Sequence, residues 1–230
     1  CGECGIILNF LIYSFLNFII MAKFDSYLLG KVSKTLGNVT MCYMNKQNIA
    51  RARIFSRKDK PTSEMLDQRA RMKVLIELSR FLLPVVQKGF VGIGNGTTSN
   101  AFVAKNMKAV DVDEKHVATI DYERLKMATG VQDVPEVSVT YSAENKMYSF
   151  EQEMQTEENG FALVDDRVYA VVFESVLMRV KLISLRSRGE NGNTSVALPK
   201  NWNHANVKIY CFATSKNGKS ISPSQYLTVE

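Results

Sequence analysis

The sequence holds two histidines and four scattered cysteines, too few for a site built from several histidines or for paired zinc-binding motifs. Five prolines and thirteen glycines exclude a collagen-like or low-complexity chain. No segment repeats at the spacing of a solenoid or a propeller, and the Gly-x-Ser-x-Gly and His-Glu-x-x-His patterns of hydrolases do not occur. We therefore predict no catalytic residues, no metal site and no cofactor, and we expect a protein that is not an enzyme.

The chain does contain enough apolar material for a folded core. Of its 230 residues, 46% are apolar and 23% are charged. That apolar fraction excludes wholesale disorder. Because a domain usually takes about 100–200 residues, the length fits one large domain or two small ones.

Charge is distributed unevenly along the sequence. The net charge is +6, but residues 23–90 carry +9 and residues 91–230 carry −2. Such a basic segment indicates a polyanion-binding patch, a solvated face, or a positive half that meets a negative half in self-assembly. The candidate residues for binding a polyanion or a partner are Lys46, Arg51, Arg53, Arg57, Lys58 and Lys60.

Residues 1–21 are interpreted as a non-native upstream segment or an apolar leader. Residues 5–20 are strongly apolar but shorter than the ~20 residues of a membrane span. No basic residue precedes them and no small-residue cleavage site follows, so we favour Met21 as the start. That start predicts a cytoplasmic or virion location and no membrane partner, whereas a genuine leader predicts the cell envelope.

Residues 22–112 are predicted to form a basic hairpin-plus-helix region. Apolar and polar residues alternate over 39–44 and 49–55, which predicts a β-hairpin joined by a loop at 45–48. An isolated hairpin is marginal in water, so this one is expected to pack on something else, such as a partner chain.

An amphipathic helix is predicted to follow the hairpin. Pro61-Thr62-Ser63-Glu64 is typical of a helix start, and apolar residues recur at three-to-four spacing as far as Leu83, before Pro84. Asp67 and Arg71 are expected to pair along this helix. The glycine-rich stretch 89–96 is expected to be a loop rather than a phosphate-binding motif, and Thr98-Ser99 to cap a short second helix.

Residues 113–230 are predicted to form an antiparallel β-sandwich, because the pattern changes to a period of two with no helical segment between strands. The pair Asn217-Gly218 predicts a type I′ turn. The predicted strands are 117–127, 136–142, 147–154, 168–175, 178–186, 194–198, 206–214 and 222–229.

Two resemblances to known families extend these expectations. Val196-Ala197-Leu198-Pro199, Val207–Phe212, the Asn217-Gly218 turn and Tyr226-Leu227-Thr228-Val229 resemble the last three strands of a fibronectin type III or immunoglobulin-like module. From Met21 onward the chain is similar to an uncharacterised family of Bacteroides-type bacteria, a domain of unknown function. The motifs that carry this second resemblance are Leu29-Gly30-Lys31-Val32-Ser33, Gly37-Asn38-Val39, Gln68-Arg69-Ala70-Arg71 and Ile120-Asp121-Tyr122. Together they imply an α+β chain that ends in a fibronectin III-like sandwich, and they imply no activity.

A few single residues are candidates for chemistry. Trp202 is an exposed-aromatic candidate for binding sugars, with Tyr43, Tyr148 and Tyr210 as further aromatics that are more typical of cross-strand packing. His116 and His204 could each act as a base, although lone histidines are usually structural. Cys42 and Cys211 are expected to be small core residues, and a bridge between them stays open.

We expect a non-catalytic structural, assembly or interaction protein, associated with a cell surface, a virion or a mobile element, that binds a neighbouring protein chain or itself. One alternative is an accessory protein that binds nucleic acid through the basic segment. The other is a carbohydrate-binding surface module centred on Trp202. A small-molecule substrate is not expected.

Overall fold

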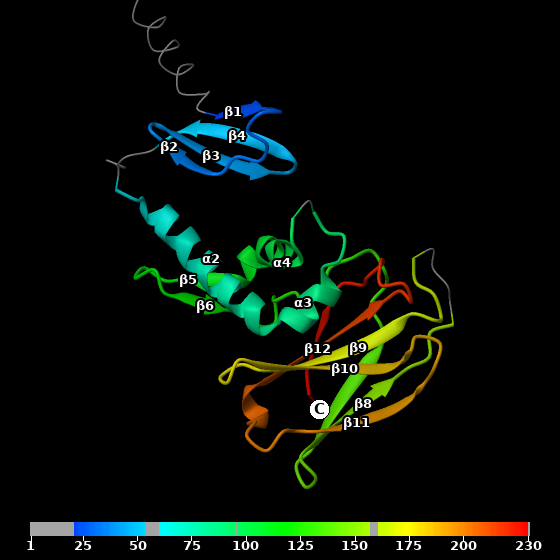
Figure 1. Cartoon of the computed structure of the whole chain (residues 1–230). Helices are drawn as coiled ribbons and strands as arrows, with labels where there is room; N and C mark the ends of the chain where they lie inside the picture. Colours follow the sequence, from blue (N-terminus) through cyan, green and yellow to red (C-terminus); the bar gives the residue numbers. More distant parts are fainter. Residues whose placement is uncertain (1–20, 54–59, 95, 157–160, 230) are drawn as a thin grey trace, which may run out of the picture. The chain divides into compact units, whose positions relative to one another are not determined.

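The computed structural model describes residues 21–53, 60–94, 96–156 and 161–229 (Figure 1). The chain divides into two compact units, residues 1–60 and residues 61–230. Within the described ranges there are three α-helices and thirteen strands, and every paired strand is antiparallel. The predicted α+β class is confirmed at this level.

The first unit contains a four-stranded antiparallel sheet in the order β1-β4-β3-β2 (Figure 1). Asn45 and Lys46 join β3 to β4 with φ values of 52° and 63°, the two positive values that a type I′ turn requires. The predicted hairpin is therefore confirmed, with a tighter turn than expected. The strands are β1 (Met21–Phe24), β2 (Lys34–Leu36), β3 (Val39–Met44) and β4 (Gln47–Ala52).

The second unit opens with the helices α2 (Ser63–Phe81), α3 (Leu83–Gly89) and α4 (Thr98–Asn106). Thr62 caps α2 as predicted, because its hydroxyl accepts a hydrogen bond from the Met65 N–H at 3.4 Å. Thr97, one residue before the predicted cap, does the same for α4. Within the described ranges, no helix combines the length and apolarity needed to cross a bilayer.

The predicted pair between Asp67 and Arg71 does not form. Asp67 Oδ1 lies 2.6 Å from Nδ1 of His116, and Arg71 donates from Nε to the Val110 carbonyl at 3.1 Å. Both side chains thus tie α2 to the hairpin of β5 (Val110–Val112) and β6 (Ala118–Ile120). The strand predicted over 117–127 is therefore too long, because the structure has a strand there only over residues 118–120.

The remaining strands form two sheets, a four-stranded one in the order β10-β9-β12-β13 and a three-stranded one in the order β11-β8-β7. Their strands are β7 (Val137–Ser142), β8 (Met147–Gln152), β9 (Arg167–Glu174), β10 (Arg179–Ser187), β11 (Gly192–Ala197), β12 (Val207–Thr214) and β13 (Gln225–Leu227). Each lies within or close to a predicted strand.

Two apolar clusters fill the second unit. The first joins the helices, through residues such as Leu75 and Phe102, to Val171 and Phe173 of β9. The second lies between the two sheets and includes Val172 of β9. Neighbouring residues of β9 therefore point into different clusters, so the four-stranded sheet lies between the helices and the three-stranded sheet (Figure 1).

The compact units differ from the predicted ranges of 22–112 and 113–230. Helices within 63–106 share the first apolar cluster with β9 and β12, so they belong to the same unit as the strands. The division instead falls between Lys60 and Pro61. The predicted leader, apart from Met21, lies outside the described residues.

Close backbone packing at two glycines fixes this unit further. A Cβ on Gly130 would lie 1.8 Å from the Ile221 carbonyl oxygen, and one on Gly89 would lie 2.3 Å from that of Met127. Neither distance leaves room for a side chain. Gly89 lets the end of α3 sit directly on the chain at Met127.

We expect residues 61–230 to fold without residues 1–60, and residues 113–230 to fail to fold. The shorter fragment lacks all three helices and would expose Val171, Phe173 and their neighbours, each worth about 1.5–3 kcal/mol when buried. Several such losses exceed the 5–15 kcal/mol that stabilises a typical domain. Thermal unfolding followed by circular dichroism tests this, and a cooperative transition of 113–230 at the melting temperature of 61–230 would contradict it.

Stability should fall as the pH rises above 9. Burial raises the pKa of the Cys211 thiol from 9.0 to about 12, so the folded protein keeps a proton that the unfolded chain releases above pH 9. The free energy of unfolding should then drop by about 1.4 kcal/mol per pH unit for this group, up to its folded pKa. Urea unfolding of Cys211→Ala at pH 8, 9 and 10 should show a shallower decline than the parent, and an identical decline would contradict the assignment.

Candidate interaction surface

The cross-strand register gives the N-terminal sheet two faces of different chemistry. Leu36 lies opposite Val39, Met41 opposite Ala50, and these residues share one side of the sheet, here named the apolar face. The other side, named the basic face, carries Arg51 opposite Thr40. The apolar face comprises Ala22, Phe24, Leu36, Val39, Met41, Tyr43, Ala50 and Ala52, together with the polar residues Lys34 and Asn48. The basic face comprises Lys23, Thr35, Thr40, Cys42, Met44, Gln47, Ile49 and Arg51, and Met21 pairs with Arg51 in this register.

Much of the apolar surface of this unit is open to solvent. Leu36 is 74% exposed, and Leu28, in the loop after β1, is 94% exposed. Of the described apolar residues in this unit, Ile49 alone is buried. Exposed apolar side chains that gather in one patch mark interaction sites in folded proteins, and the register places Leu36 beside Val39 on the apolar face.

One end of the apolar face is held by the loop between β1 and β2. The buried Asn48 side chain donates from Nδ2 to the Gly30 carbonyl at 2.9 Å and accepts from the Val32 N–H at 3.1 Å. The ammonium of Lys31 lies 5.2 Å from the ring centroid of Tyr43. These contacts fix the loop to the sheet and leave the end near Leu36 uncovered.

The structure places three of the six predicted basic residues on this sheet or next to its strands. Lys46 occupies the turn between β3 and β4, Arg51 lies on β4, and Arg53 follows β4 with its N–H donating to the Asn38 carbonyl at 2.8 Å. Lys60 lies immediately before the second unit. All four are exposed, whereas the predicted residues Arg57 and Lys58 lie outside the described residues.

The aromatic residues considered for sugar binding are not grouped on one surface. Trp202 is half-buried against the cluster between the two sheets, so part of the side chain predicted to be exposed is in the core. Tyr148 and Tyr210 are buried in the two apolar clusters. Tyr43 lies in the other compact unit.

The remaining candidates have structural partners. His204 stacks on Tyr141 with a centroid distance of 5.0 Å, and His116 contacts Asp67. Cys42 and Cys211 are both free thiols, so no bridge joins them. Across the described ranges, no three histidine, cysteine or carboxylate side chains come together as metal ligands.

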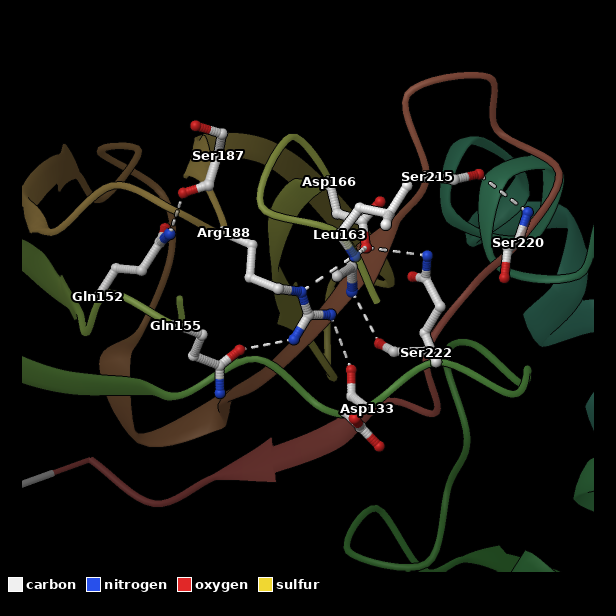
Figure 2. Close-up of polar contacts among 12 residues, drawn as sticks. Asp133, Gln152, Gln155, Leu163, Asp166, Ser187, Arg188, Ser215, Ser220 and Ser222 are labelled. Atoms are coloured by element: carbon white, nitrogen blue, oxygen red, sulfur yellow. Dashed lines mark hydrogen bonds and ion pairs between the residues drawn. The ribbon is translucent and has the colours of Figure 1, made fainter. Parts of the chain in front are cut away.

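A buried ion pair in the second unit was not predicted from the sequence (Figure 2). Arg188 and Asp166, which are 2% and 0% exposed, approach within 3.7 Å. The guanidinium also donates to Oε1 of Gln155 at 2.5 Å and to the Asp133 carbonyl at 2.8 Å. Asp166 Oδ2 accepts hydrogen bonds from the Leu163 N–H at 2.9 Å and from the Gln132 side chain at 3.0 Å.

The environment of this pair is polar but incompletely hydrogen-bonded. Burial lowers the pKa of Arg188, and the nearby Asp166 partly opposes that change. Among the described atoms, Oδ1 of Asp166 and Oε1 of Gln132 have no hydrogen-bond partner. A cavity of about 410 Å³ beside Arg188 is also lined by Asp133 and Glu136. Since the pair joins three chain segments and adjoins two carboxylates, its arrangement suits a structural tie better than an anion site.

Strand alternation could not have located Arg188. The pairing of β10 with β9 shifts between Ser184 and Ser187, and a bulge of this kind changes which face the following residues occupy. The Arg188 N–H then donates to the Asp166 carbonyl at 2.8 Å, which sets the two side chains together. Two adjacent aspartates at 165 and 166 gave no sign that only the second is buried.

Comparisons with protein-family models, curated proteins and solved structures returned no match to this chain.

Replacing Arg188 with Met should destabilise the protein by about 3–5 kcal/mol, because Asp166 would remain buried without its cation. The double variant Arg188→Met/Asp166→Asn should lose less than the sum of the two single losses, since the uncompensated charge is gone. Urea unfolding at neutral pH measures both effects. Arg186→Met, which changes an exposed arginine two residues earlier, serves as the control and should stay within about 0.5 kcal/mol of the parent. Equal effects at 186 and 188 would contradict a structural role for the pair.

Proposed function

We propose that the protein is a non-catalytic assembly protein whose N-terminal sheet binds a neighbouring protein chain, namely another copy of itself. The observation that carries this proposal is the contrast between the two units. The second unit encloses two apolar clusters, whereas the sheet of the first has Ile49 as its one buried apolar residue among those described. A small sheet with so little core gains stability when another surface covers it.

Charge supports the same proposal. Residues 1–60 hold nine Lys/Arg and three Asp/Glu, while residues 61–230 hold twenty of each. The whole net charge of +6 therefore lies in the first unit. A partner surface for it should combine apolar side chains with carboxylates, and the second unit of another copy carries such carboxylates, including the exposed Asp111 and Asp113.

We also infer that the seven strands from β7 to β13 form a fibronectin type III-like module. Lettered in chain order as A, B, C, C′, E, F and G, they give one sheet A-B-E and another C′-C-F-G, the strand arrangement of that module. The helices that cover the four-stranded sheet are an addition to it. Such modules serve as scaffolds and spacers, and by fold analogy this supports a structural role on a cell surface or a virion.

Binding of nucleic acid is the second candidate, and the exposure of Lys46, Arg51 and Lys60 favours it. The same unit also exposes Leu36 and Leu28, however, and apolar side chains of this kind add nothing to phosphate contacts. A protein partner could contact both the exposed cations and the exposed apolar side chains of this unit.

Replacing Leu36 with Glu should weaken self-association about tenfold or more. Leu36 is exposed, so the fold should be unaffected, but the change would place a carboxylate in an apolar contact. Light scattering after size exclusion, from about 1 µM to about 100 µM and at low and high salt, measures the assembly. Val176→Glu introduces the same charge at an exposed apolar residue of the second unit and should leave the assembly intact.

A strict monomer at every concentration and salt would overturn the assembly proposal. Equal weakening by Leu36→Glu and Val176→Glu would show that the N-terminal sheet is not the contact. If the chain is monomeric but binds DNA, with a steep salt dependence that Lys46→Ala and Arg51→Ala reduce, the second candidate replaces the first.

A further inference from the structure

A small basic pocket lies in the second unit, far in sequence from the N-terminal sheet. Its volume is about 230 Å³. Three segments line it: the end of α3, the first residues of β9, and the loop that follows β12. The lining residues are Gln87, Lys88, Val91, Arg167, Tyr169, Thr214, Ser215, Lys216, Asn217 and Gly218.

Among the described residues, three cations and no carboxylate line this pocket. Lys88 comes from α3, Arg167 from β9 and Lys216 from the loop after β12. Lys216 approaches Asp165 at 3.7 Å, but both side chains are largely exposed, so this pair neutralises little. Three positive charges converging on one hollow repel one another, and a bound anion would relieve that repulsion.

The fold holds two of these cations in place. Arg167 continues the row formed by Tyr169, Val171 and Phe173 on the helix-facing side of β9, so the strand fixes its direction. The ammonium of Lys88 lies 4.9 Å from the ring centroid of Tyr169. That ring is itself buried and stacked on Phe212 with a centroid distance of 5.6 Å.

The loop after β12 is fixed by its own hydrogen bonds. The Gly218 N–H donates to the Ser215 carbonyl at 2.8 Å, and Asn217 Oδ1 accepts from the Ser215 hydroxyl at 2.7 Å and from the Lys219 N–H at 3.0 Å. Because its oxygen is engaged in the turn, the Asn217 amide has its NH₂ group as a donor for a ligand. A preformed loop loses little entropy when it binds.

We propose that this pocket binds the phosphate group of a small phosphorylated molecule. A phosphate monoester carries about −1.5 to −2 charges at neutral pH and several acceptor oxygens, which matches three cations and an amide donor. The guanidinium of Arg167 can donate to two phosphate oxygens, and Lys88 and Lys216 supply point charges on either side. The volume lies below the 300–1,000 Å³ of pockets that enclose whole cofactors, so the phosphate end of a ligand would occupy it.

Titration calorimetry of the full chain at low ionic strength tests the proposal, with inorganic phosphate and glycerol 3-phosphate as probes and glycerol as the uncharged comparison. We expect both anions to bind and glycerol not to bind. Tighter binding of the ester would identify a phosphorylated molecule as the ligand, and equal binding would identify the free ion. Backbone amide shifts in nuclear magnetic resonance spectra should locate the site at Ser215 and Gly218.

Arg167→Gln and Lys216→Gln should each weaken binding of phosphate about tenfold or more, since each removes a charge-assisted hydrogen bond. Lys219→Gln is the matched control, because it removes the same charge from the same loop outside the pocket lining. All three residues are exposed, so thermal unfolding should be unchanged.

Three results would overturn the proposal. One is the absence of binding by either anion at low ionic strength. Another is equal weakening by Lys219→Gln, which would indicate only diffuse charge attraction. The third is binding of DNA that depends on Arg167 and Lys216 while neither small anion binds. None of these results bears on self-association through the N-terminal sheet, so the two proposals fail separately.

Discussion

The double burial of β9 and β12 is the constraint on which the second unit depends. Each strand sends alternate side chains into the helix-facing cluster and into the cluster between the sheets. Val171 and Val172, adjacent in sequence, thus lie in different cores. Neither the helices nor the three-stranded sheet can be removed without exposing one side of both central strands, so sequence segments that look separable fold as one unit.

Local signals in the sequence predicted the elements well, because they arise from neighbouring residues. Thr62 caps α2, and that helix ends at Phe81, shortly before Pro84, as a hydroxyl cap and a proline without an N–H predict. The short helix α3, which has Pro84 in its first turn, was not predicted. The alternation over 39–44 predicted the hairpin and the faces of its strands. What the alternation could not predict is burial: a period of two is typical of a strand with one buried face, whereas nearly every residue of β12 is buried. Two-sided burial depends on which helices pack above the sheet.

Contacts between distant segments account for the predictions that were wrong. Asp67 and Arg71 had the spacing of a helical pair, but His116 and the Val110 carbonyl, brought close by the β5–β6 hairpin, are their partners. Asn217-Gly218 suggested a type I′ turn, yet of the two only Gly218 has a positive φ, 69°. The loop is longer than a two-residue turn, since the pair that closes it is Thr214 with Ile221. In the Arg188–Asp166 pair, a bulge decides the position of the arginine, and no residue pattern marks it.

The polar pocket lies beside the apolar core at the point where the helix-facing row of β9 passes from buried to exposed residues. Arg167 pairs with Thr214 at the outer end of β9 and β12, two residues beyond the pair of Tyr169 and Phe212 and on the same face. At Tyr169 the row is still buried, and at Arg167 it reaches solvent. α3 ends at Gly89, and its last turn contributes Gln87 and Lys88 to the pocket that Arg167 and Thr214 also line. A charged residue is tolerated at 167 because its side chain is exposed there, and the adjoining loop supplies the donors that an apolar surface could not. The pocket therefore lies where the buried row of β9 reaches solvent, and Arg167, one of its three cations, is placed by a strand that builds the core.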